Sequence, residues 1–136
     1  MTTPITPTPS GLRRALDSTY DEALAAVPAA LKAEGFGVLT EIDIRATLAQ
    51  KLGVDFRRYK ILGACNPPFA HQALQADLEV GLLLPCNVVV YEDDDGHAVV
   101  LAVDPTKMMG GSDRPALVEL AVAVKERLVR ALSTLA

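Results

Sequence analysis

The chain has 136 residues and half of them are hydrophobic, which is enough for a single domain with a full core. Its 13 basic residues are scattered among 17 acidic ones, giving a net charge of −4, and this pattern argues against a nucleic-acid partner. No apolar stretch of the sequence approaches the roughly 20 residues that span a bilayer, so we expect no membrane association.

Residues 1–10 are rich in Thr and Pro and predict a disordered lead-in to one domain over residues 11–136. The lead-in has no signal-peptide pattern, and two cysteines do not make a disulfide framework, so we predict a cytoplasmic protein with reduced thiols. Over residues 12–17, Leu12, Arg14 and Leu16 alternate with Arg13, Ala15 and Asp17, which predicts a first strand. Ser18 is the expected N-cap of the helix that follows, and Gly35 is expected to close it.

A second strand and a second helix follow directly. Residues 36–42 predict the strand, and the helix is expected to begin at its cap Asp43 and to end at Gly53. Residues 58–65 predict another strand. Asn66 is the expected cap of a short helix whose first turn contains two prolines, where a backbone N–H has no partner to lose.

The C-terminal half contains the clearest hairpin of the sequence. Runs of β-branched residues at 86–92 and 97–104 flank Asp95–Gly96, which predicts a type I′ turn. Residues 105–112 predict a flexible loop whose methionines suit a pocket lid, a dimer contact or core packing. From Asp113 a long helix with an apolar stripe is expected almost to the end of the chain.

The elements are expected in the order β-α-β-α-β-α-β-β-α. Because the hairpin interrupts strict alternation, this order predicts an α+β fold, a single mixed or antiparallel sheet with helices packed on one face. Valines widen the apolar stripe of the terminal helix, and the strand over 97–104 is apolar on both faces. We therefore expect a homodimer whose contact includes the terminal helix or the hairpin strands.

Two segments of the chain are similar to a known family. They are GFGVLTEIDIRATLAQKLGVDFRRYKILGACNPPFAHQAL and GLLLPCNVVVYEDDDG. Through them the chain resembles the domain-of-unknown-function 302 family over residues 12–135. The resemblance implies a small α+β domain that in some members is a homodimer, and it implies no catalytic residue, because the family has no settled activity. The residues that match its signature are Cys65, Asn66, Pro67, Pro85, Cys86 and Asn87.

Cys65 and Cys86 are at the centre of the candidate site. They are either two small apolar residues that fill the core, or a thiol pair that is redox-active or binds a soft metal. Their spacing of 21 residues matches no C-x-x-C motif. The strand arrangement therefore decides, because antiparallel neighbouring strands bring the two thiols together, whereas parallel strands separate them by about 20 Å.

Three polar residues lie beside this pair in the sequence. His71 is either a solvated surface histidine or, on the helix that begins after Cys65, an imidazole that lowers the pKa of that thiol together with the helix N-terminus. Asn66 and Asn87 are expected to bind backbone, at a helix cap and at a strand start. The alternative for both asparagines is a role in ligand binding.

We interpret the chain as an uncharacterised cytoplasmic α+β domain, a homodimeric small-ligand-binding or accessory module without catalysis of its own. The expected ligand is small and polar or anionic, because the helix N-terminus after Cys65 offers backbone donors. We assign no catalytic residue, metal ligand or cofactor. The alternative is a thiol-dependent enzyme or soft-metal site that uses Cys65 with Cys86 and His71. The candidate ligand-binding residues are Cys65, Asn66, His71, Cys86 and Asn87.

Overall fold

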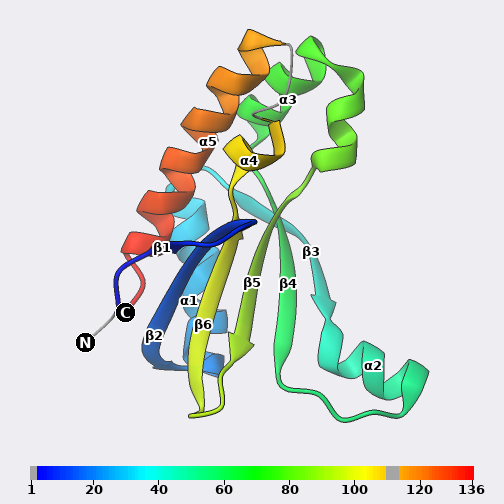
Figure 1. The fold of residues 1–136 in the computed structure, drawn as a ribbon, viewed down its shortest axis with the longest axis vertical. Coiled ribbons are helices and arrows are strands. Elements are labelled where there is room, and N and C mark those ends of the chain that lie inside the picture. The colour runs from blue at the N-terminus through cyan, green and yellow to red at the C-terminus, as the bar shows by residue number, and fades with distance from the viewer. Residues whose placement is uncertain (1–2, 110–113) are drawn as a thin grey trace.

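The computed structural model describes residues 3–109 and 114–136, and its strands form one six-stranded antiparallel sheet (Figure 1). The strand order across the sheet is β1-β2-β6-β5-β4-β3. The strands are β1 (Thr6–Pro7), β2 (Gly11–Thr19), β3 (Gly37–Asp43), β4 (Tyr59–Cys65), β5 (Cys86–Glu92) and β6 (His97–Val103). The predicted α+β class with a single sheet is therefore confirmed.

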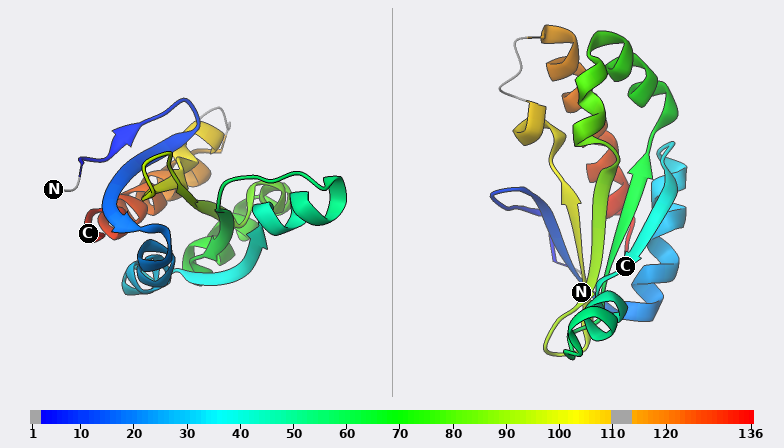
Figure 2. Two further views of the ribbon diagram at one scale, coloured as in Figure 1. Left: turned by 90° about the horizontal axis from the view of Figure 1, so that it is seen from below. Right: turned by 90° about the vertical axis from the view of Figure 1, so that its right-hand side faces the viewer.

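Helices α1 and α5 lie against one face of this sheet (Figures 1 and 2). The helices are α1 (Tyr20–Ala33), α2 (Ile44–Leu52), α3 (Pro67–Ala76), α4 (Pro105–Met109) and α5 (Pro115–Ser133), with a 3₁₀ helix η1 (Leu78–Leu83) between α3 and β5. The observed order differs from the predicted one by three additional short elements, β1, η1 and α4. No helix in the described parts of the chain combines the length and the apolar character that crossing a membrane requires.

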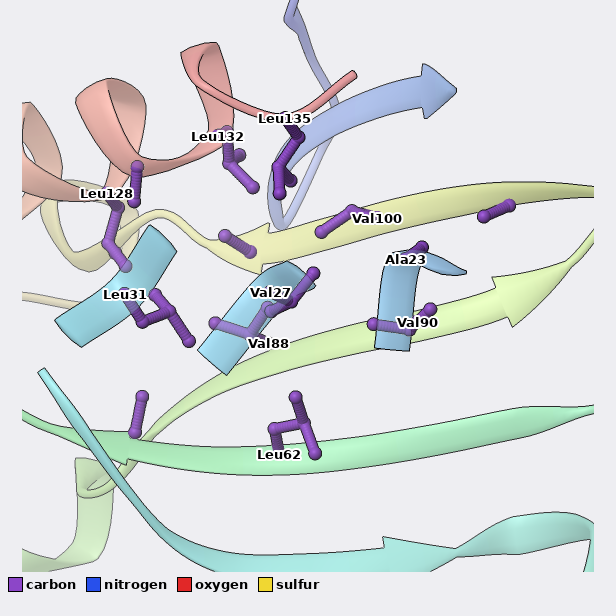
Figure 3. Close-up of a cluster of buried hydrophobic side chains, with 14 of the residues drawn as sticks. Ala23, Val27, Leu31, Leu62, Val88, Val90, Val100, Leu128, Leu132 and Leu135 are labelled. Atoms are coloured by element: carbon purple, nitrogen blue, oxygen red, sulfur yellow. The ribbon is translucent and has the colours of Figure 1, made fainter. Parts of the chain in front are cut away.

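The core lies between the sheet and this helical layer (Figure 3). It is built from Leu, Val and Ala, because each strand turns alternate residues toward the helices and each helix turns one stripe toward the sheet. The predicted stripe of the terminal helix is buried as expected along Leu117, Ala121, Leu128, Ala131 and Leu132. The side chains that meet in Figure 3 include Val27 and Leu31 of α1, Val88, Val90 and Val100 of the sheet, and Leu128 and Leu132 of α5.

The start of α1 corrects one prediction. Its N-cap is Thr19, not Ser18, because β2 continues through Thr19 before the helix begins. The Thr19 side chain accepts a hydrogen bond from the backbone N–H of Glu22 (3.2 Å), and the Glu22 carboxylate accepts one from the Thr19 N–H (3.0 Å). This reciprocal pair is a capping box, which outweighs the single bond that Ser18 would offer.

The hairpin joins β5 and β6 as predicted, but its turn is of a different type. Among the residues of the tip only Gly96 has a positive φ, +83°, whereas a type I′ turn requires positive φ at two successive residues. The Asp93 N–H donates to His97 O (2.8 Å) and the Gly96 N–H donates to Asp93 O (3.2 Å). This is a three-residue loop that ends in a left-handed glycine, and the Asp93 side chain supports it by accepting from the Asp95 N–H.

Three segments pack differently from the sequence-based expectation. Within the expected lead-in, Thr6–Pro7 forms β1 on the edge of β2. The expected loop 105–112 contains α4, while Gly110 and the predicted helix start at Asp113 lie outside the described residues. Helix α2 begins and ends at the predicted caps but buries no residue, and in Figure 1 it projects beyond the sheet.

Candidate functional site

The C-terminal end of β4 and the N-terminal end of β5 lie side by side. The two strands are antiparallel neighbours, and Ala64 pairs with Cys86 in the register. Cys65 follows Ala64 directly, so the chain brings its two cysteines to the same end of the sheet. This is the arrangement under which sequence analysis expected them to be neighbours, and both are free and partly buried thiols.

Both cysteines line one pocket at this end of the sheet, where α3, α4 and α5 come together (Figure 1). The cavity itself has a volume of about 40 Å³, and it opens into a wider depression of about 440 Å³ that includes open solvent. Almost all of its lining is apolar. The remaining lining residues are Phe36, Ala64, Asn66, Phe69, Ala70, Ala73, Leu84, Pro105, Met109, Leu120, Ala121 and Val124.

The apolar surroundings act directly on the Cys86 thiol. Burial, together with the charge that Cys65 carries when ionised, raises the pKa of Cys86 from its ordinary value of 9.0 to about 11. At neutral pH Cys86 is therefore a thiol, and the thiolate that would act as a nucleophile is scarce.

Asn66 has a structural role that differs from the predicted one. It occupies the N-cap position of α3, but its side chain makes no capping hydrogen bond. Instead Asn66 Nδ2 donates to the backbone oxygen of Glu34 at the end of α1, 3.2 Å away. Because Pro67 and Pro68 carry no N–H and the Ala70 N–H donates to Asn66 O (2.9 Å), the first turn of α3 offers few donors to an anion.

The two remaining predicted site residues lie elsewhere. His71 is exposed on α3 and does not line the pocket. Asn87 is exposed as well, and alternation along β5 turns it away from the core face that Cys86 and Val88 share. It lines a separate depression on the other face of the sheet, beside Gly11 and Val103. The structure thus brings together Cys65, Asn66 and Cys86 but neither His71 nor Asn87.

Sequence motifs did not identify most of the residues that line the pocket. Leu120, Ala121 and Val124 belong to the stripe that the sequence predicted as core, and only the packing of α3 and α4 against α5 leaves a cavity beside them. Met109 falls in the segment for which a pocket lid was one of the predicted roles, and it lines the pocket. Within residues 3–109 and 114–136, no three His, Cys, Asp or Glu side chains are grouped so as to hold a metal ion.

Comparison with known proteins gives two findings. The family model described as Domain of unknown function DUF302 matches residues 12–135. Among solved structures, the chain is similar to the crystal structure of uncharacterized conserved protein DUF302 from Bacillus stearothermophilus, with 34% sequence identity and a TM-score of 0.82. This match covers 89% of the present chain and 94% of the other one. No curated protein matches the chain.

Proposed function

Because the chain belongs to the DUF302 family, with a match that spans residues 12–135 and hence nearly the whole fold, we propose its function from its own pocket. The protein is a small-ligand-binding module without catalysis of its own, and it acts as a homodimer in the cytoplasm. One observation supports the ligand-binding role above all. A concave and largely apolar pocket lies where the two signature motifs meet, between the β4–β5 strand ends and helices α3, α4 and α5.

The lining of the pocket favours a ligand that is mainly apolar, which differs from the sequence-based expectation of a small polar or anionic molecule. A polar or anionic end of the ligand has one cationic partner nearby. The Arg127 guanidinium lies over the ring of Phe69, 5.5 Å from its centroid, and Phe69 lines the pocket. We therefore propose an apolar molecule with an anionic end, whose body contacts the pocket wall and whose charge faces Arg127.

The thiols are the basis of the second candidate function, a thiol-dependent enzyme that uses Cys65. Its support is that Cys65 and Cys86 line the same pocket. Two observations weigh against it. The pKa of Cys86 is raised, which disfavours a thiolate nucleophile, and His71, the expected base, is exposed and outside the pocket lining.

Two fluorescent probes test the proposed ligand class. They are anilinonaphthalenesulfonate, which is apolar and anionic, and phenylnaphthylamine, which is apolar and uncharged. We expect both to bind. Ala121→Phe fills the pocket and should weaken both by about tenfold or more, because a small residue in a packed wall becomes a large one. Val122→Phe, one residue along on the exposed side of α5, should leave both unchanged.

Arg127→Gln separates the two halves of the proposed ligand. It should weaken the anionic probe selectively and leave the uncharged probe unchanged. Binding that survives Ala121→Phe would place the probes elsewhere and overturn the pocket as the binding site. If Cys65→Ser and Cys86→Ser leave probe binding intact, the thiols are not needed for the ligand, and rapid alkylation of Cys65 at neutral pH would favour the enzyme instead.

The dimer is proposed from the uncovered face of the sheet. In the described parts of the chain no helix lies over the face opposite α1 and α5 (Figure 2). The strand register aligns Ile42, Ile61, Val89 and Leu101 in one apolar row across this face. An aromatic row lies beside it, formed by Phe56, Tyr59 and Tyr91. The ring centroids of Phe56 and Tyr59 are 6.2 Å apart, and those of Tyr59 and Tyr91 are 5.8 Å apart.

A second copy of the chain is the partner that suits this face. A two-fold contact sets the same patch against itself, so a charged patch would repel its own copy. Here the four residues of the apolar row are uncharged, and the one charged residue that the register adds is Arg13 of β2, which pairs with Leu101 at the end of the row. A charge pair of opposite sign, Arg57 with Asp94 (3.1 Å), lies near Tyr91. By contrast, the terminal helix exposes only part of its widened stripe: Val122 is 46% exposed, whereas Val129 packs against the core.

Sedimentation at micromolar concentration tests the dimer and its contact. We expect twice the chain mass of 14.4 kDa for the unmodified protein and for Val122→Glu. Leu101→Glu places a charge in the open sheet face and should yield monomers. A mass near 14.4 kDa for the unmodified protein would overturn the dimer. Monomers from Val122→Glu with intact dimers of Leu101→Glu would move the contact to the terminal helix.

A further inference from the structure

Most of the sulfur-bearing residues of the described chain line the candidate pocket. The described residues contain four sulfur-bearing side chains, two cysteines and two methionines. Three of them line the pocket: Cys65 from β4, Cys86 from β5 and Met109 from α4. The fourth, Met108, is 40% exposed and does not line it. Three different elements therefore each contribute one sulfur-bearing residue to the lining of one cavity.

We propose that this pocket is a site for a soft monovalent metal ion, Cu(I) or its analogue Ag(I), held by the sulfurs of Cys65, Cys86 and Met109. Thiolate and thioether sulfurs are the donors that select Cu(I), whereas Mg²⁺ and Ca²⁺ require oxygen donors. The inference rests on the pocket and not on the proposed apolar ligand, so either can fail without the other.

The choice of a monovalent soft ion over zinc follows from the donor set. Structural zinc sites use four ligands drawn from Cys, His, Asp and Glu. The described chain groups no three such residues in a metal-binding arrangement, and His71 lies outside the pocket lining. A methionine thioether supplements two cysteines for Cu(I), but it is not among the donors that zinc selects.

The residues that line the cavity include no charged side chain, so a metal ion there is balanced by the thiolates that bind it. Binding replaces the two thiol protons, one from each cysteine, with two metal–sulfur bonds, and no electron is transferred.

The test is anaerobic titration of the full chain with Ag(I), and with Cu(I) delivered as its acetonitrile complex, followed by native mass spectrometry and competition with a chromogenic chelator. We expect one metal ion per chain and protection of both thiols from a thiol reagent. Cys65→Ser and Cys86→Ser should each abolish binding at chelator-competitive affinity. Met109→Leu should weaken it by about tenfold or more, since loss of even an outer-shell partner costs that much.

Two matched variants make the assignment specific. Met108→Leu changes the neighbouring, exposed methionine, and His71→Ala removes the imidazole beside the pocket; both should bind as the unmodified chain does. Absence of a metal ion on the folded protein, or equal affinity in Met109→Leu and Met108→Leu, would overturn the three-sulfur site. Loss of binding in His71→Ala would do the same. If Cys86→Ser does not fold by circular dichroism, Cys65→Ser and Met109→Leu still decide.

Discussion

Asn66 Nδ2 donates a hydrogen bond to the backbone oxygen of Glu34 across 3.2 Å and thereby joins the start of α3 to the end of α1. The side chain of Asn66 is 7% exposed and lies against Gly35, whose φ of +88° turns the chain out of α1. Arg127 Nη1 approaches the same carbonyl oxygen at 3.4 Å. Asn66, which lines the candidate pocket, thus fixes the start of α3 against the end of α1 through this polar contact.

Asn66→Ala should lower the free energy of unfolding by about 1 kcal/mol, because it removes one buried hydrogen bond while Arg127 still satisfies the Glu34 carbonyl. Asn66→Asp should cost more, since it sets a carboxylate oxygen against that carbonyl oxygen. Urea unfolding followed by circular dichroism measures both. If Asn66→Ala leaves stability unchanged but abolishes probe binding, Asn66 is a ligand contact and not a structural one.

Gly96→Val should lower the free energy of unfolding by about 1–2 kcal/mol, because it forces a β-branched residue into a left-handed conformation. Nothing lies within 4 Å of a Cβ placed on Gly96, so the cost comes from the backbone alone. Gly37→Val is the matched control, since its site is equally open and its φ is not positive. Chemical denaturation of the two variants should separate them, and equal stabilities would contradict the turn assignment.

The Cys86 thiol should react slowly with a maleimide at pH 7.4, because its raised pKa leaves little thiolate. The same shift makes stability depend on alkaline pH. The folded chain keeps the proton up to about pH 11 while the unfolded chain loses it near pH 9, so stability should fall as the pH rises between these values. The expected slope is up to about 1.4 kcal/mol per pH unit.

Cys86→Ala is the comparison for this slope and should flatten it. Tyr20, whose pKa is raised by burial and by the nearby charge of Asp43, contributes a loss of stability of its own at higher pH, so Tyr20→Phe serves as the control. Peptide mapping after alkylation assigns the label to one cysteine or the other. Complete labelling of Cys86 within minutes in the folded protein would contradict the assigned environment.

Asp104 should stabilise the fold above about pH 4 and lose this effect in acid. Burial raises the pKa of this carboxyl, but hydrogen bonds from Thr106 and the Lys125 ammonium 3.1 Å away outweigh it, so the pKa lies below the ordinary value. A depressed carboxyl pKa stabilises above the unfolded value, and the effect disappears as the pH falls through the folded value.

Asp104→Asn should therefore cost about 1–3 kcal/mol at pH 7, the penalty for losing charge-assisted hydrogen bonds at a buried group. Its stability should also vary less than that of the unmodified chain below pH 4. Thermal unfolding at a series of pH values provides both quantities. Glu119→Gln on the exposed side of α5 is a control for the loss of one negative charge, and an equal acid response in the two variants would remove Asp104 as the cause.

Local chemistry was enough to predict several boundaries of the fold. Asp43 caps the start of α2 because its carboxylate accepts a hydrogen bond from the Ala46 N–H. Gly53 ends the helix because it adopts a φ of +66°. Both effects involve only residues within one helical turn. Pro67 and Pro68 occupy the first turn of α3 for a reason that is equally local, the missing backbone donor. The hairpin was predicted in place, but its turn type was wrong, because Asp95–Gly96 fits either a two-residue type I′ loop or the last two positions of a three-residue loop in which only Gly96 has a positive φ.

The composition of the site depended on contacts that no local signal carries. Cys65 and Cys86 share a pocket because β4 and β5 pair in an antiparallel register, and strand order follows from the packing of the whole sheet. His71 was grouped with them by its proximity in sequence, yet the rotation of α3 leaves it on the exposed side. Asn87 is adjacent to Cys86 and still lies on the opposite face, because successive residues of a strand alternate.

Local signals therefore identified the longer strands and helices, since capping, proline placement and apolar periodicity act over a few residues, but they missed the short elements β1, η1 and α4. The sequence also placed the chain within its family through two short motifs. Two features became visible only in the packed fold: α2 projects from the sheet with no buried residue, and α3, α4 and α5 enclose a cavity. An apolar stripe in the sequence indicates that one face of a helix is buried. Which element covers that face depends on the relative positions of segments that are far apart in the chain.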